Sequence, residues 1–233
     1  MKRNVSPEII RRAILDSLPR DVFAVHQPDP RFVYLPDSHI RALDPDSMLV
    51  VGARGTGKSF WWNALQDPLT RKIVSGNFPS RSHETLDVVA GWGKGSVPGK
   101  EVLATLHDFD PTIVWKTIVL ERLAPQFFNE GKLWLHPTPM SWKDRATQVQ
   151  REPERVERRF ASMDSELLKG RTRKLVLFDA LDLVADTWKE RSGLLKGLFK
   201  LLLDFRYTRS IRLKAFVRPD AIEDPAVHEF PDA

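Results

Sequence analysis

Residues 48 to 62, MLVVGARGTGKSFWW, constrain the fold of this chain more than any other stretch. Four apolar residues that suit a buried strand are followed by a turn rich in glycine. A helical pattern, KSFWWNALQD, then runs from Lys58 until Pro68 stops it. A strand, a glycine turn and a helix in direct succession predict one unit of an α/β fold with a parallel sheet.

The turn also carries a spacing that suits phosphate binding, G-x-x-x-x-G-K-[ST] with a further glycine inside it. Glycine permits a positive φ, so backbone N–H groups can point at phosphate oxygens, and the helix directs its positive dipole end at the same anion. Lys58 is expected to bridge β- and γ-phosphates, and Ser59 to bind Mg²⁺. The predicted nucleotide-contacting residues are Gly52, Ala53, Arg54, Gly55, Thr56, Gly57, Lys58, Ser59 and Phe60.

A second stretch, KLVLFDALD, supplies the acid that a phosphate loop with Mg²⁺ needs. Its four apolar residues, 175 to 178, predict a buried strand that ends at Asp179. The carboxyl ends of parallel strands meet at one edge of a sheet, so Asp179 is expected to reach the metal bound by Ser59. Asp182 follows within the next turn as a second candidate acid.

The two stretches GARGTGKS and LVLFDALD resemble the Walker A and Walker B motifs of the P-loop NTPases. Their long separation suits the ASCE branch, whose sheet inserts a strand between the two motif strands. The second motif is similar to the form found in STAND and KAP-type ATPases. This resemblance implies a three-layer α/β/α fold with a mostly parallel sheet, ATP and Mg²⁺ as ligands, and Asp182 as the residue that activates the attacking water.

Two departures from the family pattern concern hydrolysis. Ala180 stands where many ASCE ATPases have a glutamate, and Leu183 stands where STAND proteins often have one. The strand IRLKAFVRPD resembles the sensor 1 strand of this branch, which makes Arg218 a candidate reader of the γ-phosphate, the alternative being a surface arginine beside a turn. We therefore expect an ATPase whose turnover is slow or depends on a partner. Its candidate catalytic residues are Lys58, Asp179, Asp182 and Arg218.

The remaining sequence predicts two regions. Residues 1 to 45 are expected to hold a helix at 6 to 18 and an irregular, proline-rich lead-in, and residues 46 to 233 the NTPase domain. Few residues follow the third strand, so either the chain is part of a longer protein or a strand at 31 to 35 fills the sheet edge. Two further strands are expected, at 71 to 78 and at 210 to 220, with a loop at 91 to 101. Helices are expected at 110 to 127, at 140 to 170 with a break at Pro153, and at 187 to 207.

Composition narrows the function classes. The chain has no cysteine, which excludes disulfides, thiolate metal sites and a cysteine nucleophile and suits the cytoplasm. No apolar stretch is long enough to span a bilayer, so no membrane association is expected. A formal net charge of +5 fits a phosphate-rich partner, either a nucleotide or a nucleic acid. The histidines show no paired metal spacing, and no G-x-S-x-G serine motif is present.

Arginine-rich and aromatic stretches allow weaker predictions. The stretch REPERVERRF contains Arg151, Arg155, Arg158 and Arg159. One interpretation is a lid or a surface that completes a neighbour's active site. We prefer the other, a solvated helix in which Glu154 pairs with Arg158. Core packing is preferred over base stacking for Phe60, Trp61 and Trp62. By the resemblance, Tyr34 and His39 in the lead-in are candidates to lie near the nucleotide base. For Arg171, Arg173, Arg206 and Arg209, at the far end of the sheet, a local catalytic role is disfavoured, and a partner contact and a solvated surface both stay open.

Three functions remain open at this point. The first is an ATPase that couples its ATP or ADP state to a protein partner or a homo-oligomer, in bacterial signalling or defence by resemblance. The second is a small-molecule kinase with an arginine-rich lid around Arg155. The third is a non-hydrolysing nucleotide-binding module that contacts nucleic acid. A GTPase is disfavoured because no N/T-K-x-D motif is present.

Overall fold

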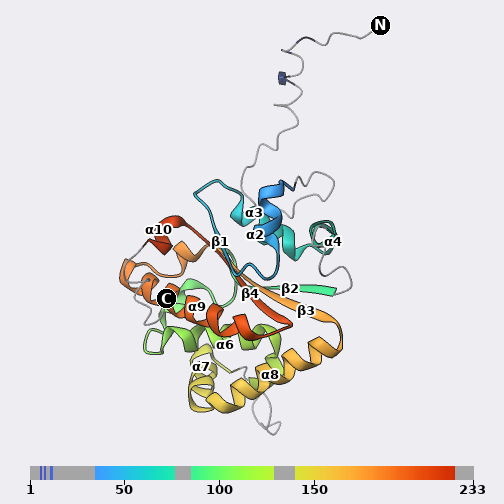
Figure 1. Ribbon diagram of the computed structural model, residues 1–233. Coiled ribbons are helices and arrows are strands. Elements are labelled where there is room, and N and C mark those ends of the chain that lie inside the picture. Colours follow the sequence, from blue (N-terminus) through green and yellow to red (C-terminus); the bar gives the residue numbers. More distant parts are fainter. Residues whose placement is uncertain are drawn as a thin grey trace.

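The computed structural model describes residues 35–76, 85–128 and 140–223, together with residues 6, 8, 11 and 12. Four strands form one parallel sheet at its centre (Figure 1). Their order across the sheet is β1 (Leu49–Val51), β4 (Ile211–Val217), β3 (Thr172–Phe178) and β2 (Thr85–Trp92). The predicted α/β class with a parallel sheet is confirmed, and β4 lies between the strands that carry the two motifs.

Helices cover both faces of the sheet, which gives the predicted three layers (Figure 1). One face carries α2 (Asp37–Leu43), α3 (Lys58–Gln66) and α4 (Pro68–Ser75). The other carries α6 (Pro111–Leu123), α7 (Trp142–Arg151), α8 (Pro153–Lys169) and α9 (Trp188–Asp204). Short helices complete the description: α5 (Lys100–Ala104), α10 (Pro219–Ile222), and the 3-10 turns η3 (Pro125–Phe128), η4 (Leu181–Leu183) and η5 (Phe205–Tyr207).

Strand β3 shows why two hydrophobic layers form. Leu175 and Leu177 pack with α3, whereas Val176 and Phe178 pack with α6 and α9 on the opposite face. All four side chains are fully buried, because successive residues of a central strand point to opposite faces. The ring of Phe178 meets Trp115 edge-on, with centroids 5.5 Å apart. The sheet is therefore fixed from both sides along the strand that ends at Asp179.

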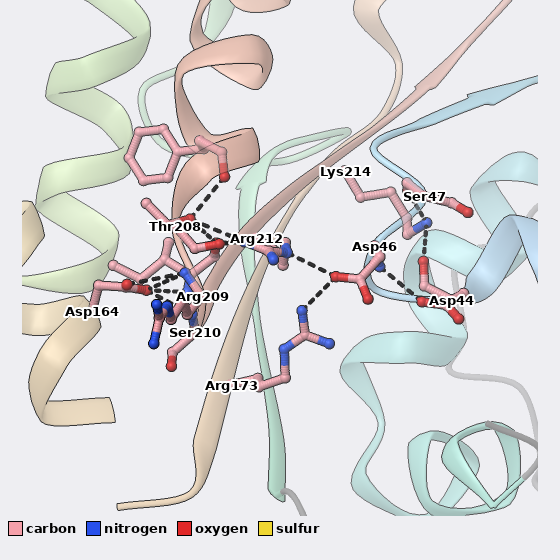
Figure 2. Close-up of polar contacts among 12 residues, drawn as sticks. Asp44, Asp46, Ser47, Asp164, Arg173, Thr208, Arg209, Ser210, Arg212 and Lys214 are labelled. Carbon is pink, nitrogen blue, oxygen red and sulfur yellow. Dashed lines mark hydrogen bonds and ion pairs between the residues drawn. The ribbon is translucent and has the colours of Figure 1, made fainter. Parts of the chain in front are cut away.

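Strand β4 carries a buried charged side chain among its apolar residues. Its Lys214 is fully buried, and its ammonium donates to the carbonyl oxygens of Ala42 (2.6 Å), Asp44 (3.0 Å) and Ser47 (Figure 2). Three carbonyl acceptors satisfy the three donors of an ammonium, so this charge is buried with partners. Lys214 thus fastens the α2–β1 connection to the sheet.

Next to this lysine, Asp46 joins the same connection to two strands (Figure 2). Its Oδ1 accepts from Arg173 Nη2 on β3 (2.6 Å) and from Arg212 Nε on β4 (2.8 Å). Arg173 is 3% exposed, so neither a partner contact nor a solvated surface fits this residue. Its role is to hold the start of β1, and thereby the glycine turn that follows β1.

The start of β4 is held from the other face by α8. Asp164 accepts the backbone N–H groups of Ser210 (2.6 Å) and Ile211 (3.0 Å), and that of Arg209 (Figure 2). A carboxylate that accepts several backbone donors satisfies groups that a parallel strand leaves unpaired at its beginning. Carboxylates on both faces therefore position β4, the strand that leads to Arg218.

Several predicted elements match and others do not. Helix α6 begins as expected, with Asp110 Oδ1 accepting from Thr112 N–H (2.7 Å), and Pro153 separates α7 from α8. The strand predicted at 71 to 78 is wrong, since these residues up to Ser75 belong to α4. Strand β2 and helix α2 were not predicted. The proposed helix at 6 to 18 and strand at 31 to 35 lie almost wholly outside the described residues.

Within the described part of the chain, no helix is both long and apolar enough to cross a membrane.

Candidate functional site

The glycine turn connects β1 to α3 as predicted. Gly52 N–H donates to the carbonyl of Val217 at the end of β4 (3.1 Å), so the turn begins in register with the neighbouring strand. Gly55 and Gly57 both have φ of +85°, a conformation that costs little for glycine and about 1–2 kcal/mol for other residues. Helix α3 starts at Lys58, with Gly57 as its N-cap. The first turn of α3 therefore points its free N–H groups toward the loop.

Lys58 reaches back into this loop. Its Nζ donates to the carbonyl oxygens of Gly52 (2.7 Å) and Ala53 (2.8 Å). Burial lowers the pKa of Lys58, and the nearby charge of Asp179 acts in the opposite direction. The hydroxyl of Thr56 donates to the same Ala53 carbonyl (2.9 Å), which closes the loop into a ring of polar groups. A phosphate would find an ammonium and a helix N-terminus on the same side.

Asp179 lies at the end of β3, directly opposite the loop. The Ser59 hydroxyl and the Ala180 N–H lie close enough to its carboxylate to act on its pKa, and its own N–H donates to the Trp92 carbonyl (2.9 Å). Only 4% of the residue is exposed. Burial raises the pKa of Asp179, and the nearby Ser59 hydroxyl is the largest influence that opposes this rise. The two predicted magnesium ligands are therefore close neighbours.

Asp182 and Arg218 join the same edge of the sheet. Arg218 Nη1 lies 3.9 Å from Asp182 Oδ2, and its Nε donates to Asp220 Oδ1 (2.9 Å). The charges of both Asp182 and Arg218 influence the pKa of Lys58. The Asp182 carbonyl also accepts from Arg191 Nη1 of α9 (3.2 Å). The four predicted catalytic side chains thus form one electrostatic cluster.

Ala180, which lies between Asp179 and Asp182 in the chain, has a strained backbone conformation. Its φ of 53° and ψ of 35° lie in the left-handed region, which residues other than glycine enter at a cost. Its carbonyl accepts from the N–H of Leu183 (2.9 Å), which closes the turn that carries Asp182. The unusual conformation therefore redirects the chain directly after Asp179 and brings Asp182 toward Arg218.

The remaining predicted contacts fall into two groups. Arg54 is exposed at the tip of the loop, whereas Phe60 is half-buried and meets the ring of Trp61 at 5.1 Å between centroids. Trp61 and Trp62 are buried in the core, as preferred from the sequence. His39 Nδ1 accepts from Trp61 Nε1 (2.9 Å), so this histidine packs on α3. Tyr34 lies outside the described residues.

The arginine-rich helix is held within its own layer. Arg155 pairs with Glu152, with 2.6 Å between Nη1 and Oε2, and its guanidinium lies 4.5 Å from the ring centroid of Phe127. Arg158 is exposed. A lid built on Arg155 would have to release both contacts, so these contacts favour the preference for a helix on the surface.

Magnesium fits the residues at the loop. Among the described residues no group of three or more His, Cys, Asp or Glu side chains forms a metal site. A magnesium ion bound with a nucleotide does not need such a group, because waters and phosphate oxygens complete its six ligands. The Ser59 hydroxyl and the Asp179 carboxylate, which lie close together, are the oxygen donors that this coordination requires.

Two residues of this edge were missed from the sequence. Asp220 pairs with Arg218, and Arg191 holds the carbonyl of Asp182. The first could have been found, because Pro219 at the start of α10 puts an acid in its first turn two residues after Arg218. The second could not, since nothing in the sequence sets α9 against the turn at Asp182.

Comparison of the chain with protein-family models, with curated proteins and with solved structures gives no match. The chemistry assigned to the site therefore rests on its residues and their geometry.

Proposed function

We propose that the chain is an ATPase that binds ATP with Mg²⁺ at the loop between β1 and α3 and couples its nucleotide state to assembly or to a partner protein. The observation that carries this proposal is that Ser59 and Lys58, from the start of α3, both lie near Asp179 at the end of β3. Three neighbouring strands, β1, β4 and β3, each end in one part of this cluster. The strand order supports the proposal, because β4 lies between the two motif strands as in the ASCE branch.

The chain's own residues have distinct tasks in this proposal. Lys58 exchanges its contacts with the Gly52 and Ala53 carbonyls for phosphate oxygens, and Ser59 and Asp179 hold the metal. The bound Mg²⁺ neutralises charge on the phosphate oxygens. Asp182 orients a water whose oxygen attacks the γ-phosphorus, the bond to the bridging oxygen breaks, and the released proton passes to Asp182 and then to solvent.

Arg218 links the phosphate to the conformation of the chain. Its guanidinium already faces Asp182 and Asp220, so a γ-phosphate would compete with two carboxylates for the same cation. A ligand shifts a conformational equilibrium only by contacts that differ between the two states. We assign that difference to Arg218, whose partners change when the γ-phosphate is lost.

ATP binding and phosphate release by purified variants test this proposal. Lys58→Ala is expected to weaken ATP binding at least tenfold, and Asp182→Asn to abolish turnover while ATP still binds. Lys143→Ala and Asp204→Asn, exposed substitutions on α7 and α9, are the matched controls. Unchanged ATP affinity in Lys58→Ala would contradict nucleotide binding at this loop. ADP formation that requires an added small acceptor would favour a kinase, and no turnover at all would favour a non-hydrolysing module.

A further inference from the structure

An open surface pocket of about 530 Å³ lies between α3, β2, the 94–97 loop and α6, on residues to which the proposed ATPase reaction assigns no task. Its size falls within the range of small-molecule sites. Trp62 and Gln66 line it from the nucleotide-loop helix, and Lys94 and Arg122 line it from the opposite side. Among the described residues that line it, none is an aspartate or glutamate.

Two of the residues that line this pocket each hold a buried donor without a partner. The indole Nε1 of Trp62 and the Nε of Arg122 are both buried without a hydrogen bond. Trp62 as a whole is 9% exposed. A buried donor without a partner costs about 1–3 kcal/mol, so such groups in a folded chain call for an acceptor.

The two cationic side chains are placed differently. Arg122 Nη2 donates to the Val97 carbonyl, which fixes the guanidinium against the 94–97 loop. Burial lowers the pKa of Arg122, with Glu121 acting in the opposite direction. Lys94 is exposed on the same loop. The fixed, desolvated guanidinium of Arg122 and the exposed ammonium of Lys94 together favour an anion, and the apolar side chains of Ala90 and Val97 favour an organic one.

The pocket is also built on the elements that carry the ATP site. Trp62 lies one helical turn after Lys58 on α3, and the Trp92 carbonyl next to the 94–97 loop holds the N–H of Asp179. A Cβ on Gly93 would lie 2.3 Å from Cζ2 of Trp62, so only glycine allows the loop backbone to rest on this indole. The loop, the indole and the nucleotide helix are therefore in direct contact.

We propose that this pocket binds a small organic anion, a molecule with a phosphate or carboxylate group beside an apolar part, separately from the nucleotide at the loop. The carboxyl or phosphoryl oxygens accept from the Arg122 guanidinium and from Lys94, beside the Trp62 indole. The apolar part lies against Ala90 and Val97. This site goes beyond the proposed ATPase activity and does not depend on it.

Titration of the full chain with AMP and with phenylacetate tests the proposal, with Mg²⁺ and saturating ADP present so that the loop is filled. We expect one of the two probes to bind with a Kd of about 1 mM or tighter and to shift the indole N–H resonance of Trp62, assigned with Trp62→Phe. Binding of AMP alone would indicate a phosphate ligand, and binding of phenylacetate alone a carboxylate ligand. Binding of neither probe would overturn the proposal.

Variants separate this pocket from the nucleotide loop. Arg122→Gln is expected to weaken the bound probe about tenfold and the exposed Lys94→Gln about threefold, whereas Lys143→Gln on α7 leaves it unchanged. Lys58→Ala is expected to lose ATP but to keep the probe. Probe binding that persists in both Arg122→Gln and Lys94→Gln, or that disappears in Lys58→Ala, would place the anion elsewhere and overturn the assignment. Loss of ATP binding alone bears on the ATPase proposal only.

Discussion

At the scale of single residues, Asp179 faces two opposing demands. The proposed magnesium binding needs its carboxylate charged, whereas burial at 4% exposure raises its pKa. The Ser59 hydroxyl and the Ala180 N–H stabilise the charge only in part, because the pKa remains raised. Residues kept for activity often cost stability in this way. A raised pKa therefore identifies Asp179 as a residue that the fold alone would not favour in its charged form.

Asp179→Asn should separate these two demands. A carboxyl with a raised folded pKa binds its proton more tightly in the folded than in the unfolded chain, so its contribution to stability falls as pH rises through the folded pKa. We expect the asparagine variant to gain about 1 kcal/mol in free energy of unfolding at pH 8, and less at pH 5, while it loses Mg²⁺-dependent ATP hydrolysis. Urea denaturation at both pH values measures the gain. Asp204→Asn is the control, and a loss of stability at pH 8 would contradict the reasoning.

Ala180 offers a second test at the same turn. Its left-handed φ of 53° costs about 1–2 kcal/mol relative to glycine, part of which the greater flexibility of an unfolded glycine offsets. We therefore expect Ala180→Gly to raise the free energy of unfolding by about 0.5–1 kcal/mol, measured by urea denaturation. Ala161→Gly on the exposed side of α8 should instead lower it by about 1 kcal/mol. Equal effects in both variants would show that Ala180 is not strained.

At the scale of elements, the sequence predicts best where a local signal agrees with the tertiary contacts. The Asp110–Pro111 start of α6 and the break at Pro153 are examples, because caps and prolines act within a few residues. The same signal was overlooked at Asp67–Pro68, where Asp67 Oδ2 accepts from Thr70 N–H (2.6 Å) and starts α4. The apolar content of α4 had instead suggested a strand.

Strand β2 and the buried lysine show what local patterns do not contain. In β2, Asp87 pairs with Lys174 of β3 at 3.1 Å, and Gly91 lies against Phe178, contacts that depend on the neighbouring strand. On β4, a lysine such as Lys214 suggests a surface residue from the sequence alone. Only the folded α2–β1 connection provides the three carbonyl oxygens that accept from its ammonium. By contrast, the sequence correctly predicted that Lys58 and Ser59 start the helix after the glycine turn and that Asp179 follows a buried strand, because these signals are local.

Lys214 makes the stability of the α2–β1 connection depend on pH. Burial lowers the pKa of Lys214 to about 7, with Asp44 and Asp46 acting in the opposite direction. Between this value and the usual pKa of an unfolded lysine, the unfolded chain binds more protons, so the contribution of Lys214 to stability increases as pH rises. We expect the stability of the wild type relative to Lys214→Met to increase by roughly 1–3 kcal/mol from pH 6.5 to pH 9.5.

Urea denaturation of the pair at both pH values measures this difference, since other groups cancel between the two chains. The exposed Lys200→Met on α9 is the matched control and should show no such dependence. A difference between wild type and Lys214→Met that stays constant over this range would show that the lysine keeps its proton in the fold throughout.

At the scale of the whole molecule, the strand order makes the candidate site. Because β1, β4 and β3 are adjacent and parallel, the loop at Gly52, Arg218 and Asp179 all emerge at one edge of the sheet. The exposed apolar residues Leu183 (55%) and Trp188 (48%) follow the turn that carries Asp182. Arg191 contacts both this surface and the site. Its Cζ lies 4.6 Å from the ring centroid of Trp188, and its Nη1 donates to the Asp182 carbonyl.

This arrangement predicts that assembly depends on the nucleotide. Exposed apolar side chains beside a site often mark a surface that a partner covers, and here the contacts of Arg191 link that surface to the turn that faces Arg218. We expect a larger species by size exclusion with light scattering when Mg²⁺ and a non-hydrolysable ATP analogue are present than with ADP. Trp188→Ser should prevent this increase while nucleotide affinity changes by less than about twofold. Tyr207→Ser, 78% exposed and at the opposite edge of the sheet, is the control that should assemble normally. The same mass with both nucleotides would remove assembly as the output of this site and leave a separate partner protein as the one to be sought.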